Sequence, residues 1–171
     1  MYLLRHAKSS WDDPGIDDFD RPLNKRGRKA SALLAKYFED QGVRPETILC
    51  SPAKRARQTL SSLSPVMVDR EATFDRRLYE ASRQTLQALL AELPARCGSV
   101  LLVGHNPGLQ RLALYLVKPV PALPALRLLN DKLPTGGLVT LSAEINDWSR
   151  LQMGACTLES FIRPNDLGTD E

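Results

Sequence analysis

The chain has 171 residues, of which 43% are hydrophobic and 25% charged, and its net charge is +3. This composition is ordinary for a soluble globular protein, and the length predicts a single domain spanning residues 1–171. The mild positive charge suits an anionic substrate but is too small to indicate nucleic-acid binding. The sequence contains no apolar run of membrane-spanning length and no signal peptide, so we expect no membrane partner.

The three cysteines, at positions 50, 97 and 156, are odd in number and widely spaced. Such a pattern indicates neither a disulfide framework nor a zinc site. We therefore expect reduced thiols in a cytoplasmic protein.

The first predicted strand is the apolar run 2–4, which ends in Arg5 and His6. Buried parallel strands have continuous apolar runs, and the sites of α/β proteins lie beyond the carboxyl ends of such strands. Arg5 and His6 are therefore where this strand would deliver reactive groups. Taken alone, the stretch fits an edge strand followed by a polar turn at least as well.

A polar loop at 9–22 precedes a predicted helix that Asn24 caps and Gly42 ends. Four cations crowd its first turns: Lys25, Arg26, Arg28 and Lys29. Cations at a helix N-terminus oppose the helix dipole, so this cluster does not serve helix stability. A solvated face is the simpler explanation, and a docking surface for an acidic partner is the alternative.

Further strands are predicted by apolar runs at 47–50, 66–68, 100–103, 138–141 and 151–153. The predicted helix starts are, in chain order, Ser51–Pro52, Ser82 and Asn106–Pro107. We expect a loop or short lid at 118–134, a hairpin across 146–147, and a frayed tail from Arg163 onward. The alternation of strands and helices predicts an α/β fold, a three-layer α/β/α sandwich with a mostly parallel central sheet.

Three strand-to-helix junctions carry similar chemistry. The first holds Arg5 and His6, the second Arg55, and the third His105. Both histidines of the chain lie at such junctions, and the carboxyl ends of parallel strands share one edge of a sheet. We therefore expect these side chains to converge.

A metal site is the obvious alternative for paired histidines, but the arginines would repel a cation and neither histidine motif contains a carboxylate. We expect no metal ion and no other cofactor. Two arginines, two histidines and helix N-termini instead suit a dianionic tetrahedral group such as phosphate. A neutral imidazole can attack phosphorus and form phosphohistidine while the other groups stabilise the equatorial oxygens.

Several motifs resemble the histidine phosphatase (phosphoglycerate mutase-like) superfamily. They are Leu4-Arg5-His6-Ala7, Arg21-Pro22-Leu23, Ser51-Pro52 with Arg55-Ala56 and Thr59, Leu78-Tyr79-Glu80-Ala81 and Gly104-His105-Asn106-Pro107. Their order and spacing cover nearly the whole chain. The short length and the runs RHAKSSW and GHNPGL are similar to the SixA-type phosphohistidine phosphatase branch.

The resemblance implies a phosphoglycerate mutase-like fold, catalytic roles for some candidate residues and substrate binding for others. It makes His6 the transiently phosphorylated nucleophile, with Arg5, Arg55 and His105 as the phosphate pocket. Glu80 falls near the position of the leaving-group acid of larger members, although a glutamate that merely precedes a helix is an equal alternative. Arg21 borders the pocket, and Thr135 lies in a turn that lines it in family members.

The function expected on this basis is hydrolysis of a phosphohistidine-containing protein. The segment between residues 63 and 100 is short, so an open site that admits a protein surface is expected. A phosphohistidine substrate would also need little acid assistance. The alternatives are a small phosphate ester as substrate, such as a sugar phosphate or nucleotide, or a non-catalytic phosphate-binding module. Nucleic acid is not expected, because no aromatic residues are interleaved with the basic ones.

Overall fold

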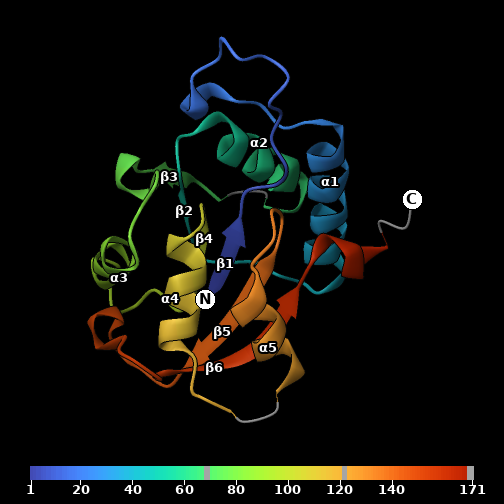
Figure 1. Cartoon of the computed structure of the whole chain (residues 1–171). Helices are drawn as coiled ribbons and strands as arrows, with labels where there is room; N and C mark the ends of the chain where they lie inside the picture. Colours follow the sequence, from blue (N-terminus) through green and yellow to red (C-terminus); the bar gives the residue numbers. More distant parts are fainter. Residues whose placement is uncertain (68–69, 121–122, 169–171) are drawn as a thin grey trace.

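The computed structural model describes residues 1–67, 70–120 and 123–168. Its centre is a six-stranded sheet with the order β3-β2-β4-β1-β5-β6 (Figure 1). The strands are β1 (Tyr2–Arg5), β2 (Thr47–Cys50), β3 (Ala72–Phe74), β4 (Val100–Gly104), β5 (Leu138–Ala143) and β6 (Cys156–Ile162). The first four are mutually parallel, while β5 and β6 join as antiparallel additions. The predicted α/β fold with a mostly parallel sheet is confirmed.

Helices cover both faces of this sheet. One face carries α1 (Lys25–Asp40) and α2 (Lys54–Leu63), and the other carries α3 (Arg83–Ala91), α4 (Gly108–Leu116) and α5 (Pro124–Asp131). Neighbouring residues of the central strand β1 serve the two layers: Leu3 packs with the α3–α4 side and Leu4 with the α1–α2 side. Side chains alternate across a strand, so a strand buried on both faces must be apolar throughout.

The register of the parallel strands brings the predicted junctions to one edge. Arg5 pairs with Gly104, and Cys50 pairs with Val103. The residues that follow these strands, including His6 and His105, therefore emerge side by side at the upper edge of the sheet in Figure 1.

Two strand predictions are wrong. Residues 64–66 form a 3₁₀ turn that begins next to Pro65, Val66 and Met67 are buried in the core, and residue 68 lies outside the described residues. Residues 151–153 form a turn, where Leu151 is buried and Met153 is exposed. In both places the apolar residues mark burial rather than extended backbone, which periodicity cannot distinguish in such short runs. The true strands, β3 and β6, begin several residues later.

The late strands do pair antiparallel as expected, but a 3₁₀ helix at Trp148–Arg150 lies in their connection in place of a tight hairpin turn. The expected lid at 118–134 contains α5. The tail does not fray directly after Arg163, because the 3₁₀ helix Pro164–Leu167 packs against α1. No helix in the described ranges is long and apolar enough to cross a membrane.

The helix caps divide into two groups. Asn24 and Ser82 accept hydrogen bonds from backbone amides of the helices they precede, as predicted. Ser51 and Asn106 do not cap, and α2 and α4 begin later than predicted. The Ser51 hydroxyl is instead engaged by a histidine, and the Asn106 amide donates to the Leu133 carbonyl at 3.0 Å.

Gly27 holds the start of α1 against the loop that follows His6. A Cβ atom at this position would lie 2.1 Å from the Lys8 carbonyl oxygen, a backbone atom that cannot move aside. We expect Gly27→Ala to lower the free energy of unfolding by about 2 kcal/mol or more, as overpacking against rigid atoms does. Urea unfolding measures this difference. In the matched control Gly98→Ala, the new methyl group meets the flexible Glu46 side chain, so equal losses in both variants would contradict the prediction.

Candidate active site

His6 lies directly after β1 and is 7% exposed. Its Nδ1 atom lies 2.8 Å from the Ala7 carbonyl oxygen, which can only accept, so Nδ1 carries the proton. The unprotonated Nε2 atom then accepts a hydrogen bond from the Nε–H of Arg55 at 3.2 Å. The Ala7 amide in turn donates to the Thr59 hydroxyl at 3.0 Å, which fixes the backbone beside the ring. The contacts thus present the Nε2 lone pair of His6 toward the cationic side of the site.

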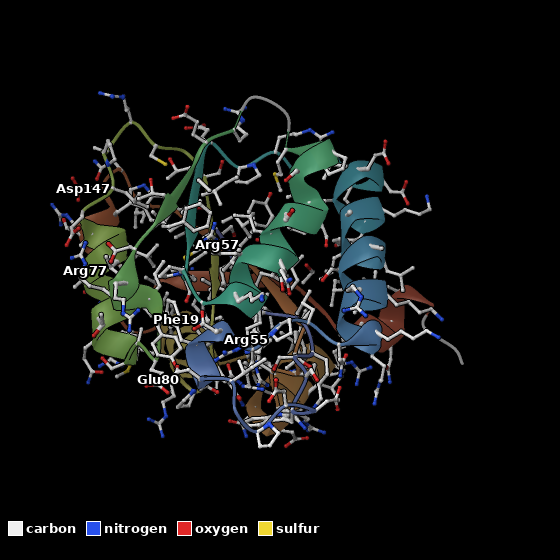
Figure 2. All side chains as sticks on the ribbon, turned by 90° about the horizontal axis from the view of Figure 1, so that it is seen from above. Phe19, Arg55, Arg57, Arg77, Glu80 and Asp147 are labelled. Carbon is white, nitrogen blue, oxygen red and sulfur yellow. The ribbon has the colours of Figure 1, made fainter. Side chains whose placement is uncertain are left out.

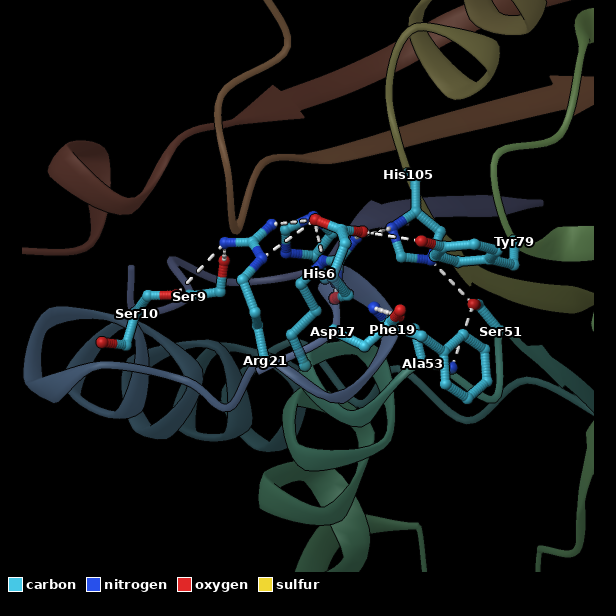
Figure 3. Close-up of polar contacts among 12 residues, drawn as sticks. His6, Ser9, Ser10, Asp17, Phe19, Arg21, Ser51, Ala53, Tyr79 and His105 are labelled. Carbon is cyan, nitrogen blue, oxygen red and sulfur yellow. Dashed lines mark hydrogen bonds and ion pairs between the residues drawn. The ribbon is translucent and has the colours of Figure 1, made fainter. Parts of the chain in front are cut away.

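Arg55 lies in the first turn of α2 (Figure 2). It contacts both histidines of the site, His6 and His105, whose surroundings Figure 3 shows. Its guanidinium reaches His6 through Nε, and its Nη2 lies 3.4 Å from Nδ1 of His105. The same Nη2 forms an ion pair of 2.9 Å with the Asp18 carboxylate. The side chain is almost fully buried, so it presents a fixed fork of donors to any anion in the site.

His105 follows β4 and is oriented by Ser51. Its Nε2 atom lies 2.7 Å from the Ser51 hydroxyl oxygen. Because the guanidinium of Arg55 can only donate, Nδ1 of His105 accepts and Nε2–H donates to Ser51. The rings of His105 and His6 lie 5.0 Å apart between centroids, and the edge of the Tyr79 ring contacts His105.

The Asp18 carboxylate bridges the cations of the site. It accepts hydrogen bonds from Arg55, from Arg21 at 2.8 to 2.9 Å, and from the Tyr79 hydroxyl at 2.7 Å. Partial burial opposes its ionisation, but the bonds from Tyr79 and Arg21 and the charge of Arg55 outweigh that effect and lower its pKa to about 2. A carboxylate therefore sits among the groups that would bind a phosphate.

Burial lowers the pKa of both histidines to about 3, and the nearby arginines act in the same direction. Both rings are therefore neutral near pH 7. A neutral imidazole is required for nucleophilic attack. A bound dianion would favour the protonated form of either ring, because an opposite charge raises a histidine pKa.

The matching family model is the histidine phosphatase superfamily (branch 1), over residues 1–99. The chain belongs to the histidine phosphatase superfamily.

Relatives of similar length extend this match. An uncharacterized protein of Mycobacterium tuberculosis is 33% identical over 163 residues, which cover 94% of this chain and 99% of the relative. The phosphohistidine phosphatase SixA of Escherichia coli is 33% identical over 126 residues, covering 68% of this chain and 71% of SixA. A crystal structure described as a candidate SixA from Agrobacterium tumefaciens is 31% identical, covers 95% of this chain and 96% of its own, and superposes with a TM-score of 0.78. This member of the superfamily is therefore SixA-like in sequence and structure.

The structure brings together most of the residues that the sequence singled out. His6, Arg55 and His105 are in mutual contact, and Arg21 joins them through Asp18. Arg5 lies beside them, where burial and the charge of Arg55 lower its pKa, and its Nη1 donates to the Leu133 carbonyl at 2.8 Å.

Two predicted site residues lie outside this contact network. Glu80 is exposed and lies toward the periphery in Figure 2, with its backbone in the left-handed region at φ 52°. Thr135 lines a cavity beside Arg5 and makes no hydrogen bond to either histidine among the described residues.

Three residues of this contact network are not among the site residues predicted from the sequence: Asp18, Tyr79 and Ser51. Tyr79 and Ser51 belong to motifs that resemble the superfamily, so the sequence does indicate their part of the chain. The local pattern, however, predicts Ser51 only as a helix cap. Asp18 lies in a loop with many acidic residues and carries no distinguishing local pattern. Only the folded chain shows that this one carboxylate reaches Arg55.

The Asp18 carboxylate competes with a phosphate for the same cations, and it repels a dianion. We expect Asp18→Asn to bind the phosphate mimic vanadate roughly tenfold more tightly, which corresponds to about 1.4 kcal/mol. Inhibition constants measure this, with Asp20→Asn as the control because Asp20 is exposed on the same 3₁₀ turn. Weaker binding by Asp18→Asn would show instead that the carboxylate organises the pocket.

The two neutral histidines also make stability depend on pH. Their folded-state pKa of about 3 lies below the unfolded value, so the unfolded chain binds protons first as the pH falls. We expect the free energy of unfolding to fall from about pH 6.5 toward pH 3, by up to about 1.4 kcal/mol per pH unit for each ring. Urea unfolding at several pH values should give a shallower slope for His105→Asn than for the wild type. An unchanged slope would contradict the assignment of a buried neutral ring.

Proposed function

We propose that this protein is a phosphatase that works through a phosphohistidine intermediate on His6, and that its substrate is a phosphohistidine-containing protein. The observation that carries the proposal is the tautomer of His6. Its proton is held on Nδ1 by the Ala7 carbonyl, so the Nε2 lone pair faces the cationic pocket.

In the first step, Nε2 of His6 attacks phosphorus, and the bond from phosphorus to the leaving nitrogen of the substrate breaks. The leaving imidazole takes a proton and departs. In the second step, water attacks the phosphohistidine, a proton leaves the water, and inorganic phosphate departs as His6 returns to its neutral form. Splitting the transfer in this way replaces one difficult step by two easier ones.

The other site residues interact with the negative charge of the phosphoryl group. In this proposal, Arg55, Arg5 and His105 bind the equatorial oxygens, whose charge they stabilise in the transition state. Arg21 forms an ion pair with Asp18. If the phosphate replaced that carboxylate, the positive charge of Arg21 would act on the phosphate instead. Thr135 lines the approach beside Arg5.

Glu80 is the residue whose role is least supported by the geometry. It is exposed, and its side chain makes no hydrogen bond among the described residues. A phosphohistidine substrate fits such a site, because its labile P–N bond and imidazole leaving group need little acid assistance. The alternative substrate, a small phosphate ester, requires a proton donor for an alkoxide and would depend on Glu80.

Two further observations support a protein substrate. The described residues between α2 and β4 contain only a short edge strand, 3₁₀ turns and the nine-residue helix α3, so they hold no long insertion that could cover the site. The relative SixA of Escherichia coli is a phosphohistidine phosphatase.

The three cysteines are free thiols, which supports a reducing compartment such as the cytoplasm.

The test compares a phosphohistidine protein with a panel of sugar phosphates and nucleotides, using wild type and Glu80→Gln. We expect the phosphohistidine protein to be preferred and its hydrolysis to be unchanged by Glu80→Gln. A strong preference for sugar phosphates or nucleotides, with activity lost in Glu80→Gln, would overturn the proposal in favour of a small-molecule phosphomonoesterase. Phosphate binding without turnover of either class would show a non-catalytic module.

A further inference from the structure

A basic cavity of about 840 Å³ adjoins the candidate active site on the side of Arg5. Its walls come from the loop after β1, the first turns of α1, the end of α5 with the turn that follows, and the segment after β6. The cations that line it are Arg5, Lys8, Arg26, Lys29, Lys132 and Arg163. The sole carboxylate among the described lining residues is that of Asp131.

The cavity is joined to the nucleophile through the backbone. The Gly136 amide, in the turn that forms one wall, lies 3.1 Å from the Arg5 carbonyl oxygen and 3.0 Å from that of His6. On the other wall, Gly27 lies so close to the Lys8 backbone that α1 packs directly against the loop after His6. A group seated in this cavity is therefore positioned beside a phosphoryl group at His6.

The charges of the cavity are largely uncompensated. Arg163 forms an ion pair with Asp166, but no ion pair within the described ranges engages Lys8, Arg26, Lys29 or Lys132. The Nε atom of Arg5 is buried without a hydrogen-bond partner. The first turn of α1 contains no acidic residue to offset its cations. An anionic ligand would offset the cations that oppose the helix dipole and could pair with the unpaired donor.

The residues that line the cavity indicate which kind of anion it would bind. Lys8, Lys29 and Lys132 are exposed and offer flexible point charges, and Arg26 is an exposed guanidinium. None of these four cations is buried as a built phosphate site would require. Leu128, which is 42% exposed, lies in the same lining, as do Pro134 and Ala30. A free polyphosphate gains nothing from an exposed leucine, whereas protein interfaces combine apolar contacts with complementary charges at the rim.

We propose that this cavity docks an acidic surface of the phosphorylated partner protein, with carboxylates beside the phosphohistidine contacting Arg26 and Lys29. This inference rests on the proposed function and names the partner's chemistry. It also assigns a role to two members of the basic cluster at 25–29, Arg26 and Lys29. A solvated face is the simpler sequence-based explanation of that cluster.

The test uses Lys29→Glu, with Lys25→Glu as a matched control. Both substitutions reverse one exposed charge in the first turns of α1, but Lys25 does not line the cavity. A glutamate near a helix N-terminus is favoured by the dipole, so neither variant is expected to unfold. The substrates are a phosphohistidine protein with carboxylates beside its phosphohistidine, the same protein with those carboxylates changed to amides, free phosphohistidine, and a small sugar bisphosphate.

We expect Lys29→Glu to lower kcat/KM for the acidic protein by roughly threefold to tenfold, mainly through KM, with free phosphohistidine unaffected. Lys25→Glu should match the wild type, and the amide form of the substrate should remove the difference between variants. Equal behaviour of the two variants on the acidic protein would overturn the docking surface while leaving the proposed function intact. A loss confined to the sugar bisphosphate would overturn the protein partner in favour of a small anionic ligand. If the wild type hydrolyses neither protein form, the proposed function itself fails, and the docking surface fails with it.

Discussion

His6→Ala is expected to lose phosphatase activity by at least about a thousandfold, because removing a nucleophile removes the covalent route as a whole. The buried ring presents its Nε2 lone pair toward Arg55, and the other imidazole of the chain, His105, is held by the Ser51 hydroxyl. The measurement is kcat with the phosphohistidine protein, together with trapping of the phosphorylated enzyme after rapid acid-free quenching. Wild type should carry a base-stable, acid-labile phosphoryl group on His6, and the variant should carry none.

Thermal unfolding of the same samples separates a chemical loss from a structural one. His6→Asn serves as a second variant, because its side chain remains polar in a buried position. If either variant retains activity near the wild-type level while folded, His6 is not the nucleophile. Label recovered on His105 instead of His6 would exchange the roles of the two histidines.

Arg55→Lys is expected to lower kcat/KM by roughly a hundredfold, although it preserves the charge. The guanidinium contacts His6, His105 and Asp18 at once, through three different nitrogens. A lysine ammonium is a single point on a flexible stem and cannot span these positions, so transition-state charge would lose its preorganised donors. Steady-state kinetics measures this, and the loss should fall mainly on kcat.

Arg57→Lys is the matched control for that prediction. Arg57 lies two residues along the same helix, is exposed, and stacks over Phe74 away from the histidines. It should keep nearly full activity. If both lysine variants lose activity equally, the arrangement of hydrogen-bond donors on the Arg55 guanidinium is not specifically required for catalysis.

The local sequence was sufficient for much of the fold. Continuous apolar runs predicted β1, β2 and β4 because a strand buried on both faces must be apolar at every position. Asn24 and Ser82 marked helix starts because their side chains satisfy amides that the helix leaves unpaired. The failures came where a tertiary contact competed with the local pattern. Ser51 would be a good cap, but its hydroxyl is bonded to His105.

For the site, the sequence by itself determined which groups stand at the strand ends: Arg5, His6, Arg55 and His105. Strand order and register then decide which of them meet, and that information is not local. The tertiary structure alone placed Asp18 between Arg55 and Arg21, and it left Glu80 exposed. Asp18 is one of several acids in a polar loop, and its low pKa arises from partners up to 61 positions away in the chain. Such a charge balance depends on distances that only folding sets, because electrostatic interactions are weak in water and strong where side chains exclude it.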